Sequence, residues 1–149
     1  MRILALDVGT KTIGVAVSDE LGIAAHGVTT IKRTELKRDL DALGKIIDEY
    51  NPSEILVGIP YNFDGTVSKR GKEILKFAET LKKTFPIPVE FWDESFSTVR
   101  AEEVLLEADL SRKKRKKVID KMAAVFILEG YLEEKRRAAT KAQGHEENT

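Results

Sequence analysis

The spacing of apolar residues in this chain limits the folds that it can adopt. Three short apolar runs, at 3–8, 12–18 and 23–30, are separated only by tight turns that contain glycine or aspartate. This pattern predicts three antiparallel strands in a meander. From about position 34 the apolar residues instead recur every three or four positions, which predicts helices. A meander followed by helices and strands in alternation predicts a sheet with both antiparallel and parallel neighbours.

The rest of the chain alternates helices with two further strands. We expect strands at 54–59 and 89–92. We expect helices at 34–50, 97–108 and 118–137, and a further helix that contains residues 74–81. The order β-β-β-α-β-α-β-α-α predicts an α/β fold with a mixed five-stranded sheet and helices on both faces. The length favours one domain, which we place at 1–137, followed by a flexible tail at 138–149.

Acidic residues stand where the predicted elements converge. Asp7 ends the first strand, and Asp93 and Glu94 end the fifth. Ligands of open α/β sheets gather beyond the carboxyl ends of the strands. Asp120 lies early in the last helix, on the same face as Ala123, Ala124 and Ile127, where an acid is costly unless a cation or a donor meets it. The residues alone leave other interpretations open. Asp7 is also consistent with a turn residue, Asp93 and Glu94 with a solvated strand end, and Asp120 with an acid at a helix start.

Carboxylates without histidine or cysteine ligands suit a hard cation that prefers oxygen. The chain contains no cysteine, so a thiolate zinc site is excluded. Asp7, Glu94 and Asp120, with Asp93 as a further ligand, are therefore candidates for binding Mg²⁺, with Mn²⁺ as a substitute. Two such ions about 4 Å apart activate a water and stabilise the leaving oxygen when a phosphodiester is hydrolysed.

Net charge does not predict nucleic-acid binding, because 25 basic residues balance 25 acidic ones. One local run of cations is the exception, and it predicts a loop that orders on a phosphate backbone. The run consists of Arg112, Lys113, Lys114, Arg115, Lys116 and Lys117. Lys11, in the first turn, is a second candidate for a phosphate contact. A loop containing Pro60, Asp64 and Gly65 follows the fourth strand and is expected to position the substrate.

The apolar run at the N-terminus is too short for a signal peptide or a membrane span, and Asp7 interrupts it. Together with the lack of cysteine, this predicts a cytoplasmic protein without a membrane partner.

Four segments resemble the motifs of the YqgF/RuvX family. They read DVGTKTIGVAVSD, VGIPYNFDG, DESFST and IDKMAAVFILEGYLE, and the resemblance extends from Arg2 to about Glu133. It implies a ribonuclease H-like fold. It also implies an activity described either as Holliday junction resolution or as cleavage of pre-16S ribosomal RNA.

The resemblance also implies which residues form the site. The three acids of the family correspond to Asp7, Glu94 and Asp120 in this sequence. Ser95 stands where the family usually has an arginine, which would contact the scissile phosphate. Arg100 or the basic run is therefore the candidate for that contact.

The leading hypothesis is a metal-dependent endonuclease that processes the 5′ end of pre-16S ribosomal RNA, with structured RNA and ribosomal precursor particles as partners. The alternative is a Holliday junction resolvase acting on branched DNA. A resolvase normally needs a symmetric dimer, and no dimerisation stripe stands out, so we expect a monomer or a weak dimer. A non-catalytic nucleic-acid-binding module is the alternative from another class, and the retained acids argue against it. An actin-like ATPase is disfavoured because the chain lacks a second phosphate loop.

Overall fold

Five strands form one mixed sheet in the computed structural model of this chain. The model describes residues 1–62, 64–93 and 112–147, with side chains described at 122–140 of the last helix. The strands are β1 (Ile3–Val8), β2 (Thr12–Ser18), β3 (Ala25–Lys32), β4 (Glu54–Ile59) and β5 (Val89–Asp93). Their order in the sheet is β3-β2-β1-β4-β5. The first three pair antiparallel, and β4 pairs parallel with both β1 and β5, which confirms the predicted mixed sheet.

Alternate residues of the central strands belong to two separate cores, one on each face of the sheet. Leu4, Leu6 and Val8 of β1 pack in the first core, whereas Ile3 and Ala5 pack in the second. A strand that buries both faces reads as a continuous apolar run, which is why the sequence predicted β1 and β4 with their observed bounds.

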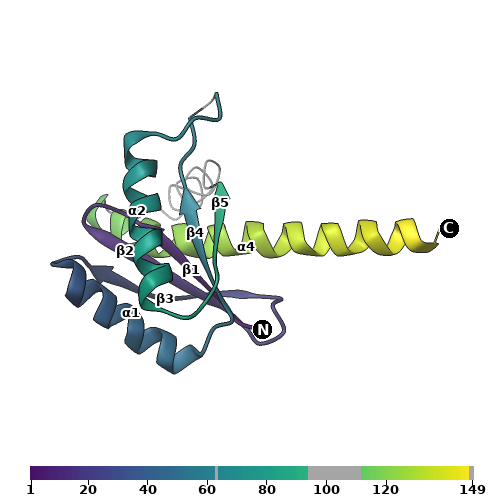
Figure 1. Ribbon diagram of the computed structural model, residues 1–149, viewed down its shortest axis with the longest axis horizontal. Coiled ribbons are helices and arrows are strands. Elements are labelled where there is room, and N and C mark those ends of the chain that lie inside the picture. The colour runs from purple at the N-terminus through teal and green to yellow at the C-terminus, as the bar shows by residue number, and fades with distance from the viewer. Residues whose placement is uncertain (63, 94–111, 148–149) are drawn as a thin grey trace.

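Helices cover both faces, as the sequence predicted (Figure 1). The first core is closed by α1 (Leu36–Tyr50) and α2 (Lys69–Thr84). The second core is closed by α4 (Arg112–Glu147) through Ala124, Ile127, Leu128 and Leu132. Figure 1 shows that α4 passes behind the sheet and continues well beyond it, and residues 133–140 of this extension are exposed.

The bounds of α4 differ from the prediction at both ends. The basic run 112–117 was expected to be a loop, which is wrong, because these residues form the first turns of the helix. Lysine and arginine are good helix formers, and the run contains no glycine or proline to interrupt the helix. At the other end the helix continues through 138–147 instead of ending at 137. The helix predicted at 97–108 lies outside the described residues.

Candidate active site

Asp7 lies at the carboxyl edge of the sheet, on the face that α4 covers. In a strand, alternate side chains share a face, so Asp7 follows Ile3 and Ala5 toward the second core. Its side chain is half-buried. Val8, the next residue, is buried in the first core on the other face. The end of β1 therefore presents a carboxylate to the α4 side of the sheet only.

Glycines flank Asp7 on the strands to either side. Asp7 pairs with Gly14 of β2. Leu6 pairs with Val57 of β4, so Gly58 is the next position along, on the other side of Asp7. Because neither glycine has a side chain, no side chain of β2 or β4 stands directly beside the carboxylate at these positions. Gly58 was not among the predicted site residues, although a glycine inside a buried strand is a known sign of a close approach by a ligand or another backbone.

The turn that follows Asp7 is held in place by Arg33, just beyond β3. The backbone N–H of Arg33 donates to the carbonyl oxygen of Lys11 at 2.8 Å, and its Nη1 donates to that of Gly9 at 2.8 Å. A side chain at Gly9 would place Cβ 3.0 Å from the carbonyl oxygen of Thr12, so this close turn favours glycine. Lys11 itself is exposed in this turn, at the edge where Asp7 lies.

Asp93 lies on the opposite face from Asp7. Val89 and Phe91 pack in or against the first core, whereas Trp92 packs against the second. Asp93 continues the alternation of Val89 and Phe91, so its exposed side chain is directed to the α1 and α2 side of the sheet. Across the described residues, no three histidine, cysteine, aspartate or glutamate side chains come together as a metal-binding group.

Of the other two predicted acids, Glu94 lies outside the described residues, as do Ser95 and Arg100. Asp120 lies within α4, but its side chain is not described. Its position in the helix precedes Ala124 by one turn and Ile127 by two, and both of these residues are buried against the sheet face that carries Asp7. The backbone therefore places residue 120 on the helical stripe that faces the sheet. The backbone of 112–117 lies in the same helix, just before it.

The loop at the end of β4 is shaped by Asp64. Its Oδ1 accepts hydrogen bonds from the backbone N–H of Thr66 at 3.0 Å and from the Thr66 hydroxyl at 2.6 Å. The hydroxyl bond is the main reason why the pKa of Asp64 lies below its ordinary value. Gly65 has a φ of 83°, which favours glycine. Pro60, Asp64 and Gly65 thus belong to an ordered turn at the carboxyl edge, beside β1 and β5.

A family model described as Holliday junction resolvase, RuvX, matches residues 1–134 of this chain. The chain belongs to the RuvX family. A RuvX-family relative from Clostridioides difficile is 56% identical over 132 residues, covering 89% of this chain and 94% of its own. One from Clostridium novyi is 52% identical over 133 residues, covering 89% and 98%. Both carry the description "Putative pre-16S rRNA nuclease". The predicted family and the predicted class of enzyme, a nuclease that hydrolyses phosphodiester bonds, are confirmed.

Solved structures confirm the ribonuclease H-like fold of this RuvX-family chain. RuvC of T. thermophilus, in complex with a Holliday junction substrate, aligns with a TM-score of 0.58 at 15% identity and covers 91% of this chain and 96% of its own. The resolvase of fowlpox virus, in complex with Holliday junction DNA, also aligns with a TM-score of 0.58 at 15% identity and covers 90% and 98%. Among the described residues, no helix has the length and apolar character that a membrane span requires.

Proposed function

We propose that this RuvX-family nuclease is a divalent-metal-dependent endonuclease that processes the 5′ end of pre-16S ribosomal RNA. The description shared by the clostridial relatives supports this substrate. The observation that carries the chemistry is the setting of Asp7, a half-buried carboxylate at the carboxyl edge with a glycine on the strand to each side. This setting supports close approach of a phosphate group to the carboxylate.

Asp7, Glu94 and Asp120 are the residues that we assign to the metal site, with Mg²⁺ as the expected ion and Mn²⁺ as a substitute. All three offer carboxylate oxygens, which are the ligands that these ions prefer. One or two such ions, when bound, would activate a water and neutralise charge on the phosphate. Asp93 is the weaker candidate because it lies on the face opposite Asp7.

The nucleic acid backbone is proposed to contact cations around this site. Lys11 is exposed in the turn after Asp7, and the run 112–117 precedes Asp120 in the same helix. Arg100 is a further candidate, in place of the family arginine that Ser95 replaces. Pro60, Asp64 and Gly65 belong to the loop that we expect to position the substrate.

A cleavage assay with Mg²⁺ tests the proposed function. Pre-16S ribosomal RNA fragments, four-way DNA junctions and plain duplexes are compared with wild-type protein, Asp7→Asn and the control Asp41→Asn, whose side chain is exposed on α1. We expect the wild type and Asp41→Asn to cut the RNA at its 5′ processing site. Asp7→Asn should lose nearly all cleavage while still binding RNA, because the substitution removes a metal ligand and leaves the basic residues in place.

Equal cleavage by wild type and Asp7→Asn would show that the assigned site is wrong. Cleavage of the junction in preference to the RNA would favour the alternative, a resolvase acting on branched DNA, which the description of the family model supports. Binding without any cleavage would favour the non-catalytic module.

Glu94 and Asp93 can be separated by a pair of neighbouring substitutions. Glu94→Gln should lose cleavage nearly completely. Asp93→Asn should keep most of it, because Asp93 follows Val89 and Phe91 on the other face of the sheet. Titration of activity against Mg²⁺ concentration distinguishes a lost ligand from a damaged fold, since only a lost ligand shifts the midpoint to higher concentration. The opposite ranking of the two variants would assign the ligand to Asp93.

We propose a cytoplasmic protein that acts on RNA or on ribosomal precursor particles, as a monomer or a weak dimer. Residues 1–137 would form one nuclease domain with 138–149 as an appended tail, an arrangement supported by the end of the family match at 134. Sedimentation across a concentration series would reveal a stable dimer, which only the junction alternative requires.

A further inference from the structure

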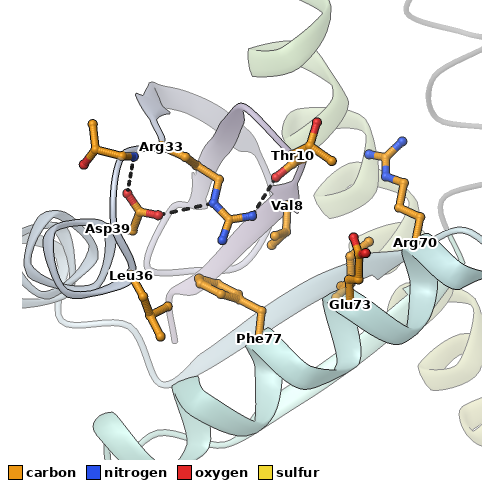
Figure 2. Close-up of a pocket in the computed structure, with 11 residues that line it drawn as sticks. Val8, Thr10, Arg33, Leu36, Asp39, Arg70, Glu73 and Phe77 are labelled. Carbon is orange, nitrogen blue, oxygen red and sulfur yellow. Dashed lines mark hydrogen bonds and ion pairs between the residues drawn. The ribbon is translucent and has the colours of Figure 1, made fainter.

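A pocket of about 350 Å³ opens beside the end of β1, on the face of the sheet opposite Asp7. Three parts of the chain surround it (Figure 2). They are the turn at Gly9 and Thr10, the segment from Arg33 to Asp39 that enters α1, and the first half of α2. Its volume lies within the range of sites for small organic ligands.

The floor of the pocket is apolar. Val8, Ile74 and Phe77 line it and are buried in the first core. Figure 2 shows Phe77 reaching toward the guanidinium of Arg33, and the carbon Cζ of Arg33 lies 5.2 Å from the centre of the Phe77 ring. Because this guanidinium lies over the ring and Phe77 is buried, a flat, partly apolar ligand would meet mainly the guanidinium plane of Arg33, a surface on which nucleobases stack.

Arg33 is a donor that is fixed in advance. Its Nε lies 3.2 Å from Oδ2 of Asp39, and its Nη1 donates to Gly9, so two of its nitrogens hold the side chain in place. Asp39 is only 2% exposed, and its Oδ1 also accepts from the backbone N–H of Thr34. Among the described residues, these bonds engage Nε and one N–H of Nη1, so Nη2 is the nitrogen that remains for a ligand.

The rim carries charges of both signs. Arg70 and Glu73 lie three positions apart on α2, and both side chains are exposed. Figure 2 draws both on the side of α2 that faces the pocket. With Arg33 and Asp39, the pocket holds two cations and two anions, so it suits neither a bare phosphate nor a metal ion. These features together suit a nucleotide. Its base would lie inside, on the apolar floor and beside fixed donors and a carboxylate acceptor, and its phosphate would lie at the rim, at Arg70.

The position of the pocket relates this ligand to the nuclease site. Asp7 and Val8 are consecutive residues of β1, so the carboxylate and the pocket floor lie on opposite faces at one strand end. A strand of nucleic acid that crosses the turn at Gly9 and Thr10 would reach both. We propose that this pocket binds one unpaired nucleotide of the substrate strand close to the scissile phosphate. The inference rests on the proposed function and narrows its substrate to a strand with an unpaired nucleotide at that place.

Fluorescence of 2-aminopurine tests the pocket without requiring cleavage. The probe is a short oligonucleotide with 2-aminopurine at one unpaired position, titrated with wild-type protein, Leu36→Trp and Leu21→Trp in the absence of metal. Leu36 lines the pocket and is 48% exposed, so a tryptophan there fills the mouth without entering the core. Leu21 is 82% exposed in the turn between β2 and β3 and provides the matched control.

We expect the emission to change on binding of the single strand and not of a fully paired duplex. Leu36→Trp should bind the unpaired probe roughly tenfold more weakly, the scale of one lost base stack, and Leu21→Trp should bind like the wild type. Thermal melting of both variants confirms that they fold. Equal binding by the two variants would overturn the proposal.

Adenosine monophosphate serves as the free-nucleotide arm of the same experiment. One outcome is that the wild type binds the monophosphate, Leu36→Trp does not, and the unpaired strand causes no emission change. This outcome would overturn the strand assignment in favour of a free nucleotide. The cleavage assay with Asp7→Asn is independent of these measurements. A failure of the pocket proposal can therefore be distinguished from a failure of the proposed nuclease function.

Discussion

Nε of Arg33 lies 3.2 Å from Oδ2 of Asp39, and this ion pair joins the end of β3 to the start of α1. Asp39 is buried, whereas the side chain of Arg33 is 25% exposed. Through Gly9, the same arginine also holds the turn that follows Asp7. The pair therefore links the stability of the domain to the geometry of the sheet edge where Asp7 lies.

Asp39→Ala should lower the free energy of unfolding by about 3 kcal/mol, because it leaves the Arg33 guanidinium half-buried without its carboxylate partner. Asp41→Ala, at an exposed position on the same helix, should change it by less than about 0.5 kcal/mol. Urea unfolding monitored by circular dichroism gives both values. Similar midpoints for the two variants would contradict a structural role for the pair.

Gly71→Ala should displace the loop after β4. An added Cβ would lie 2.6 Å from Cγ1 of Val67, too close to be tolerated without movement, and 3.4 Å from the carbonyl oxygen of Pro60. The single variant should lose stability by about 1–3 kcal/mol, as overpacked sites do. Gly71→Ala combined with Val67→Ala should recover part of that loss. If the changes in the free energy of unfolding of the two single variants were strictly additive, the contact would not matter.

Gly130→Val should disturb Trp92 at the end of β5. A Cβ at position 130 would lie 3.3 Å from Nε1 of Trp92, so even alanine requires the indole to move by a few tenths of an ångström, and valine requires more. Trp92 is the only tryptophan of the chain, so its emission reports the change directly. We expect a shifted emission maximum and weaker cleavage, since Trp92 lies two positions before Glu94. Ala139→Val, on the exposed part of α4, should leave both unchanged.

A cluster of Glu54, Tyr131 and Lys135 should make stability depend on pH in the alkaline range. Nζ of Lys135 lies 3.1 Å from Oε1 of Glu54, and the Tyr131 hydroxyl lies 3.4 Å from both carboxylate oxygens. Burial, reinforced by the charges of Glu54 and Glu90, raises the pKa of Tyr131. Burial would lower the pKa of Lys135, but its bonds to Glu54 and Tyr131 outweigh burial and raise it.

In both cases the folded chain holds a proton that the unfolded chain releases at its ordinary pKa of 10.0 or 10.5. The stabilisation is therefore complete below about pH 10 and is lost as the pH rises through the folded values. Urea midpoints measured from pH 8 to 11 should fall less steeply for Glu54→Gln than for the wild type. Glu79→Gln, which removes an exposed ion pair with Lys82, should follow the wild type.

The elements that the sequence predicted best are those whose local pattern decides their structure. β1, β2 and β4 were predicted with their observed bounds, because continuous apolar runs end at glycine, aspartate or proline. The basic run was placed in a loop because charge suggested solvation, whereas helix propensity and the continuing helix decide its structure.

The candidate site could be predicted only in part, for a similar reason. The sequence predicts that Asp7 and Asp93 lie at the carboxyl ends of β1 and β5, and therefore at the same edge of one sheet. That they face opposite sides depends on the register and pleat of β5, where Trp92 packs toward α4 and Phe91 away from it. The pocket at Arg33 depends on how α1, α2 and the first turn meet, and no short segment of sequence carries that information.

The position of α4 has a consequence for the order in which this protein becomes active. Its helix closes the second core and, on the proposed assignment, supplies the last metal ligand, Asp120, from the final third of the chain. Chains emerge from the ribosome with the N-terminus first. A nascent copy would therefore carry Asp7 in a half-covered sheet, without cutting activity, until its last helix has been released and has docked.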